Sequence, residues 1–115
     1  MPASLRPLDD SPYARHIPAL ISAARDVRGR AWGKYSGFRV GAAILTHDSD
    51  AIYTGVNVEG IDYAAIHAEA AAIASYVGSG TTLAPVMIVA VGAPNGFGGD
   101  VPIIETCGGC RQRIF

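Results

Sequence analysis

Cysteine is scarce in this chain, which has two among its 115 residues, Cys107 and Cys110. A single closely spaced pair does not make the disulfide framework of a small secreted domain, which needs more cysteines at wider spacing. In a reducing compartment, a C-x-x-C pair instead indicates metal binding or redox chemistry. Three interpretations stay open for the pair: a catalytic metal site, a structural metal site and a redox dithiol.

Long apolar runs and an excess of positive charge are also missing. No stretch reaches the roughly 18 apolar residues of a membrane span, and the first 16 residues lack the apolar core of a signal peptide. Nine Lys and Arg face ten Asp and Glu, for a formal net charge of −1. Without a basic stripe we expect no nucleic-acid partner. We therefore expect a soluble, cytoplasmic protein with no membrane partner and a small-molecule ligand.

The length and hydrophobicity of the chain predict a single domain over residues 1–115. Half of the residues are hydrophobic and 17% are charged, so one core can be filled. Residues 1–10, rich in Pro and Asp, are expected to be a flexible lead-in. A domain of this size leaves much of its surface in water, so that burial through self-association would add stability.

Hydrophobic periodicity predicts alternating helices and strands. Helices are expected over 12–32, 67–77 and from about 107, the first beginning at Ser11-Pro12 and ending at Gly33. Strands are expected over 38–45, 51–58 and 86–91, with turns at 34–37 and 46–50. The short turn between the first two strands favours an antiparallel hairpin, and the apolar run 86–91 is typical of a central strand. The fold class is α/β: a three-layer α/β/α sandwich with a mixed sheet.

Two short motifs open the second and third predicted helices, and the apolar strand between them places both helix starts at one edge of the sheet. His67, Cys107 and Cys110 supply one imidazole and two thiolates, which suit Zn²⁺ and leave its fourth position open to water. Glu69 follows His67 by two residues and so can lie beside the metal without binding it. A carboxylate there can move protons, and H-x-E followed by C-x-x-C is the signature of zinc deaminases.

The alternatives explain less of the pattern. A redox dithiol would leave the H-x-E motif without a role. A structural zinc site normally has four protein ligands, and the sequence offers three strong candidates.

Several motifs in the right order resemble the cytidine deaminases. The matching segments are YSGFRVGAA at 35–43, NVE at 57–59, HAE at 67–69 and CGGCRQ at 107–112. The resemblance implies a cytidine deaminase-like fold, zinc-dependent hydrolysis of a free cytosine nucleoside and a homo-oligomer, with a tetramer as the family's pattern. It also implies the family's roles for matching residues. Asn57 and Glu59 would bind the ribose hydroxyls, Phe38 would pack against the pyrimidine, the Ala68 N–H would contact the base carbonyl, and Glu69 would be catalytic.

Departures from the family pattern keep alternative functions open. Gly60 replaces the usual Asn, Thr106 replaces the usual Pro, and the acidic Glu105 precedes it. A modified cytosine nucleoside such as blasticidin S is therefore an alternative substrate. The chain ends at Phe115, earlier than the family generally does, which leaves a non-catalytic zinc-binding relative as a further alternative. An RNA- or DNA-editing deaminase would need a basic channel, and the balanced charge argues against it.

Overall fold

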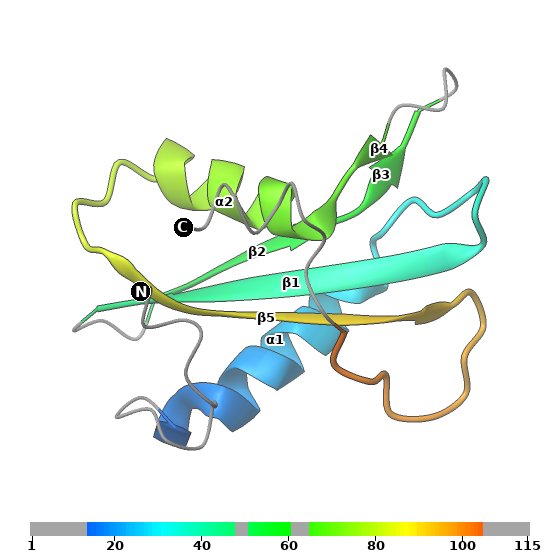
Figure 1. Cartoon of the computed structure of the whole chain (residues 1–115), viewed down its shortest axis with the longest axis horizontal. Coiled ribbons are helices and arrows are strands. Elements are labelled where there is room, and N and C mark those ends of the chain that lie inside the picture. The colour runs from blue at the N-terminus through cyan, green and yellow to red at the C-terminus, as the bar shows by residue number, and fades with distance from the viewer. Residues whose placement is uncertain (1–13, 48–50, 61–64, 105–115) are drawn as a thin grey trace.

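The computed structural model describes residues 14–47, 51–60 and 65–104 of the chain (Figure 1). Its elements are a 3-10 helix at Ala14–His16, α1 (Ile17–Arg28), β1 (Phe38–Thr46), β2 (Ile52–Val56), β3 (Val58–Glu59), β4 (Ala65–Ile66), α2 (Ala68–Gly78) and β5 (Pro85–Pro94). The predicted flexible lead-in, the helix start at Ser11-Pro12 and the helix near Cys107 lie outside the described residues. None of the helices in the described part is long and apolar enough to cross a membrane.

A three-stranded sheet in the order β2-β1-β5 forms the middle of the fold. β1 and β2 pair antiparallel with Ala42 opposite Gly55, which confirms the predicted hairpin. β1 also pairs antiparallel with β5, and both pairings in this sheet are antiparallel. The parallel pairing that a mixed sheet requires is not found among the described strands of this sheet.

The middle position of the three-stranded order belongs to β1 rather than to the apolar strand near residues 86–91. β5 nevertheless has a neighbour on both edges, because residues 101–104 run along its other side. The N–H of Gly92 donates to the carbonyl of Pro102 at 3.0 Å, and the N–H of Ile104 donates to the carbonyl of Ala90 at 2.9 Å. An apolar composition suits β5 because the core covers both of its faces.

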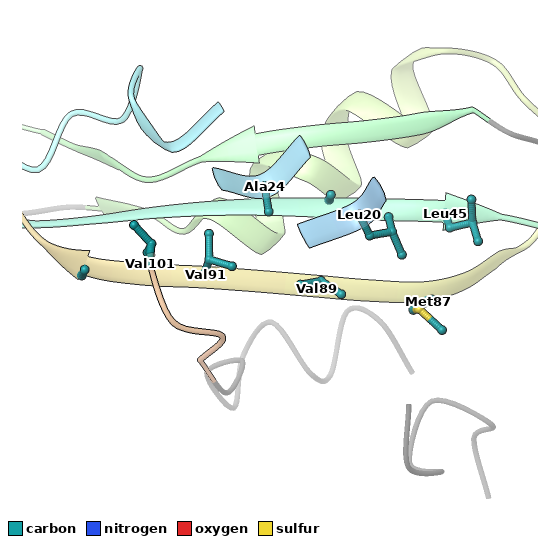
Figure 2. Packing of buried hydrophobic residues seen from close by; sticks show 9 residues of the cluster. Leu20, Ala24, Leu45, Met87, Val89, Val91 and Val101 are labelled. Carbon is teal, nitrogen blue, oxygen red and sulfur yellow. The ribbon is translucent and has the colours of Figure 1, made fainter. Parts of the chain in front are cut away.

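Helices cover opposite faces of the sheet, which confirms the three-layer arrangement (Figure 1). Side chains alternate between the two faces along β1, so Ala43 and Leu45 face α1 while Ala42 and Ile44 face α2. Figure 2 shows the α1 side, where Leu20 and Ala24 lie against residues of β1 and β5. The fully buried side chains on the α2 side are mostly alanines, including Ala68 and Ala72 of the helix, and Ile73 and Tyr76 of α2 pack against them while partly buried.

The first helix ends five residues before the predicted end at Gly33. α1 ends at Arg28, and Gly29 caps it by donating its N–H to Val27. The following residues form a short turn, after which the N–H of Trp32 donates to the carbonyl of Asn57 at 2.9 Å. The carbonyl of Trp32 accepts from Glu59 at 3.0 Å. Pairing with another strand consumes the backbone groups that a longer helix would need, so the predicted end was wrong.

The second predicted strand, 51–58, is two strands with a break at Asn57. β2 ends at Val56 and continues the main sheet, whereas β3 begins at Val58 and pairs with β4. At the break, the N–H of Asn57 still donates to Val40 at 3.3 Å, while its carbonyl accepts from Trp32. Asn57 is therefore the residue at which the chain leaves one sheet and enters the other.

Gly55 lets α2 lie directly on β2. A Cβ at this position would fall 2.5 Å from the carbonyl oxygen of Ala68 and would overlap the backbone nitrogen of Ala72. Both atoms belong to the first turns of α2, so the missing side chain sets how close the start of that helix comes to the sheet.

We expect Gly55→Ala to destabilise the fold by about 1–3 kcal/mol or more, because backbone rather than a flexible side chain must move. Chemical denaturation of the variant measures the loss. Gly78→Ala is the matched control, since a Cβ there meets nothing within 4 Å. Equal stability of the two variants would contradict the close packing of α2 on β2.

Candidate active site

The start of α2 brings together the two residues of the H-x-E motif. His67 is the N-cap residue, extended at φ −77° and ψ 149°, and its carbonyl accepts the N–H of Ala71 at 2.9 Å. Its side chain is exposed, whereas Ala68 and Glu69 are buried. The helix forms here because alanines dominate it and because Ala68 and Ala72 pack on the sheet. The motif is thus placed by the same residues that fill the α2 side of the core.

Glu69 is one of two polar side chains that are buried in the described part of the chain, the other being Thr46. Only 4% of Glu69 is exposed. Burial of a carboxylate costs free energy, so natural folds keep such groups mainly where they have a partner or a task. Its position in the first turn of α2 lies at the positive end of the helix dipole, which favours a negative charge.

Asn57 connects the beginning of β1 to the end of β2 through its side chain. Its Oδ1 accepts from the N–H of Val40 at 2.8 Å, and its Nδ2 donates to the carbonyl of Phe38 at 3.0 Å. Each amide atom can make one further hydrogen bond, because the oxygen has two lone pairs and the nitrogen two protons. Asn57 therefore has a structural task and still has capacity for a ligand.

Glu59 holds the turn that precedes β1. Its Oε1 accepts from the N–H groups of Tyr35 and Ser36, each at 3.0 Å. The pKa of Glu59 lies below its ordinary value of 4.5, chiefly because the Ser36 N–H stabilises the carboxylate. Partial burial opposes this effect, while the Ser36 hydroxyl and the Tyr35 N–H add to it. The carboxylate is thus ionised at neutral pH and fixes the turn at residues 34–37 that the sequence predicted.

A lowered pKa makes this contact dependent on pH. The stability that Glu59 contributes is complete above 4.5 and is lost as pH falls through the lowered pKa. We expect Glu59→Gln to lower the melting temperature at pH 7, and we expect the gap to wild type to close under strong acid. Thermal melts from pH 7 to pH 3 measure the gap, with the exposed Asp100→Asn as control. A gap that stays constant over that range would contradict the assignment.

Phe38 begins β1 on the face that α2 covers, and it is partly exposed. Its ring lies over Gly92 of β5: a Cβ on that glycine would be 2.8 Å from Cε1 of Phe38 and 2.9 Å from Cδ1 of Ile104. Gly92 was not singled out from the sequence, since a glycine within an apolar strand carries no sign of the ring that crosses it. The missing side chain at Gly92 leaves room for the Phe38 ring on the α2 side of the sheet.

Of the three predicted zinc ligands, the structure describes His67. Cys107 and Cys110 lie outside the described residues, and the described part alone contains no group of three metal-binding side chains. The last described residue, Ile104, packs against the cluster that contains Ala68. One imidazole and two thiols are a donor set that fits zinc.

Comparison with known families decides what kind of domain this is. Residues 15–115 match the family described as the cytidine and deoxycytidylate deaminase zinc-binding region. The chain belongs to that family. The match confirms the resemblance that the four motifs indicated, and it includes every residue proposed for the site.

Known cytidine deaminases resemble this chain in sequence and in fold. A probable cytidine deaminase of Dictyostelium discoideum is 39% identical over 93 residues, which are 80% of this chain and 58% of that protein. The chain thus spans 58% of the length of this curated relative. Cytidine deaminase from Mycobacterium tuberculosis superposes with a TM-score of 0.74 at 29% identity, covering 85% of this chain and 74% of that one. The enzyme from Burkholderia pseudomallei gives 0.69 at 37% identity, covering 84% and 72%. The α/β, cytidine deaminase-like fold predicted from the sequence is confirmed.

Proposed function

We propose that this chain hydrolyses the exocyclic amine of a free cytosine nucleoside, converting cytidine or deoxycytidine to the uridine form and ammonia. One observation carries the proposal: in a member of the deaminase family, Glu69 is buried in the first turn of α2, two residues after a histidine at the N-cap. A buried carboxylate beside a candidate metal ligand is suited to proton transfer.

His67, Cys107 and Cys110 are the residues that would hold zinc. With two thiolates and one imidazole, these side chains would leave a coordination position for water. Zinc bound there supplies a water acidic enough to act as a nucleophile near neutral pH. The start of α2 contributes to the site because the helix dipole favours negative charge at its N-terminal end.

Glu69 would move the protons of the reaction. Its carboxylate would accept a proton from the attacking water, deliver one to N3 of the pyrimidine, and supply the last proton to the leaving ammonia. The attack on C4 forms a C–O bond, and departure of ammonia breaks the C–N bond, so that hydrolysis consumes one water. Burial beside the core keeps Glu69 away from bulk water that would compete for its proton.

The substrate would lie between the start of α2 and the start of β1. Ala68 is the first residue of α2, so its N–H has no acceptor within the helix and can donate to the base carbonyl. The Phe38 ring would pack against the pyrimidine. Asn57 and Glu59 would bind the ribose hydroxyls, Asn57 through its remaining donor and acceptor capacity and Glu59 through Oε2.

A substrate panel tests the function. Purified protein supplied with zinc is assayed for ammonia release from cytidine, deoxycytidine and blasticidin S under identical conditions. The proposal predicts turnover of cytidine or deoxycytidine. Turnover of blasticidin S alone would show that the substrate is a modified cytosine nucleoside instead of cytidine or deoxycytidine. Bound zinc with no turnover of any of the three compounds would favour a non-catalytic relative.

An exposed apolar row formed by Trp32, Val58 of β3 and Ile66 of β4 supports the further proposal that the protein is a homo-oligomer. Trp32 pairs with Val58, and Val58 pairs with Ile66, so the three lie side by side across this small sheet. They are 55%, 39% and 56% exposed respectively. Adjacent exposed apolar side chains are typical of protein interfaces. We expect a tetramer, as the resemblance to the cytidine deaminases implies, and light scattering of the purified protein measures the subunit number.

A further inference from the structure

The last residue of α1, Arg28, reaches across the sheet to two strands. Its Nε donates to the carbonyl of Arg39 in β1 at 3.0 Å. Its Nη2 donates to the carbonyls of Ala93 and Pro94 in β5, each at 2.9 Å. A planar guanidinium with several fixed donors can connect two strands in this way, whereas a lysine ammonium is a single point of charge.

The residues that Arg28 contacts form one end of the β1–β5 ladder. Phe38 pairs with Pro94, and Arg39 pairs with Ala93, as the final two pairs of that ladder. Strand ends open most readily because they have fewest neighbouring hydrogen bonds. Arg28 therefore joins the two strands at the place where they would separate first.

The other face of the same ladder end carries the proposed substrate contacts. Phe38 packs over Gly92 there, and the Asn57 amide bonds to the backbone of Phe38 and Val40. The segment 38–40 is thus fixed twice, by Asn57 from the β2 edge and by Arg28 from the α1 face. Gly41 permits the second contact, since a Cβ there would come within 3.0 Å of the Cβ of Arg28 and would overlap the carbonyl oxygen of Ala24.

We infer that Arg28 is a positioning residue for substrate binding. It lies on the α1 face of the sheet, opposite the ring of Phe38, and it acts by fixing the backbone that carries Phe38 and orients Asn57. This inference rests on the proposed function, because it assumes that Phe38 and Asn57 bind the nucleoside.

Steady-state kinetics of Arg28→Met test the inference. Methionine keeps an apolar stem and removes every donor. Because the affected residues bind the ground state and the transition state alike, we expect KM for cytidine to rise about tenfold while kcat changes less than about threefold. Arg30→Met is the matched control, since Arg30 is exposed two residues further along. Arg28→Lys, which can contact one strand at a time, should give an intermediate KM. An unchanged KM in both Arg28 variants overturns the inference.

A double-mutant cycle with Phe38→Ala separates positioning from general destabilisation. If Arg28 acts through Phe38, the effects of Arg28→Met and Phe38→Ala on KM are not additive. Additive effects would overturn the inference, even if Arg28→Met lowers the melting temperature. Should Arg28→Met fail to fold, the same cycle is carried out with Arg28→Lys.

Amide hydrogen exchange tests the role of Arg28 without using enzymatic activity, so the failure of this inference can be told apart from the failure of the proposed function. We expect amide exchange in residues 38–40 and at Gly92, Ala93 and Asn95 to accelerate about tenfold in Arg28→Met and to stay unchanged in Arg30→Met. If wild type deaminates no cytosine nucleoside, the proposed function fails, and faster exchange still shows that Arg28 holds this end of the ladder. Unchanged exchange overturns the role of Arg28 whatever the activity.

Discussion

Glu69→Gln is expected to lower kcat for cytidine by about 10²–10⁴-fold, the range that a positioned general acid–base group contributes. Glutamine has nearly the same shape and fits the same buried position, but it cannot accept and return a proton at neutral pH. Glu69 is 4% exposed in the first turn of α2, so water has little access to substitute for it. The steady-state rate of ammonia release at saturating cytidine measures kcat.

Zinc content and the melting temperature decide whether a loss of activity comes from Glu69 itself. The variant should keep about one zinc per chain and a wild-type far-UV spectrum, because Glu69 is not among the proposed ligands. Asp26→Asn on α1 is the control for removing an exposed carboxylate, and its activity should match wild type. Full turnover by Glu69→Gln would refute the proton-transfer role.

Replacement of a single ligand is expected to remove the metal. In His67→Ala and in Cys107→Ala, zinc should fall from about one per chain to nearly none, and activity should disappear with it. Two remaining ligands bind zinc far more weakly than three. Metal analysis after dialysis against a mild chelator measures the content.

His47→Ala is the matched control for His67→Ala. Both side chains are exposed in the described structure, but His47 follows the end of β1 that lies away from Phe38. It should keep its zinc and its activity. If the His67→Ala variant and the Cys107→Ala variant each kept their zinc, the proposed ligand set would be contradicted.

The regular elements could be predicted because their signals are local. The run FRVGAAIL marked β1, an alanine-rich run marked α2, and an unbroken apolar run marked β5. The two errors at Gly33 and Asn57 have one origin. Trp32 exchanges hydrogen bonds with Asn57 and Glu59, and this pairing ends the helix early and divides the strand. Periodicity reports which residues are buried along one element, and it carries no information about a partner 25 residues away.

The residues of the candidate site also fall into two groups, those with a local sequence signal and those whose role depends on distant partners. His67 and Glu69 could be proposed from the sequence because they form a local motif, two residues apart at the start of one helix. The tasks of Asn57 and Glu59 in holding β1 and its preceding turn could not be foreseen, since their partners are backbone groups about 20 residues earlier. Gly92 and Arg28 gave no signal at all. Their importance arises only when Phe38 crosses one face of the ladder end and the guanidinium crosses the other.

X-ray absorption spectroscopy of the zinc-loaded protein tests the central claim most directly. If His67, Cys107 and Cys110 hold the metal and leave one position for water, the first shell contains two sulfur atoms and two nitrogen or oxygen atoms. In Cys107→Ala the metal, and with it this absorption signal, should be almost completely lost. A shell without sulfur, or one made only of oxygen atoms, would contradict the account.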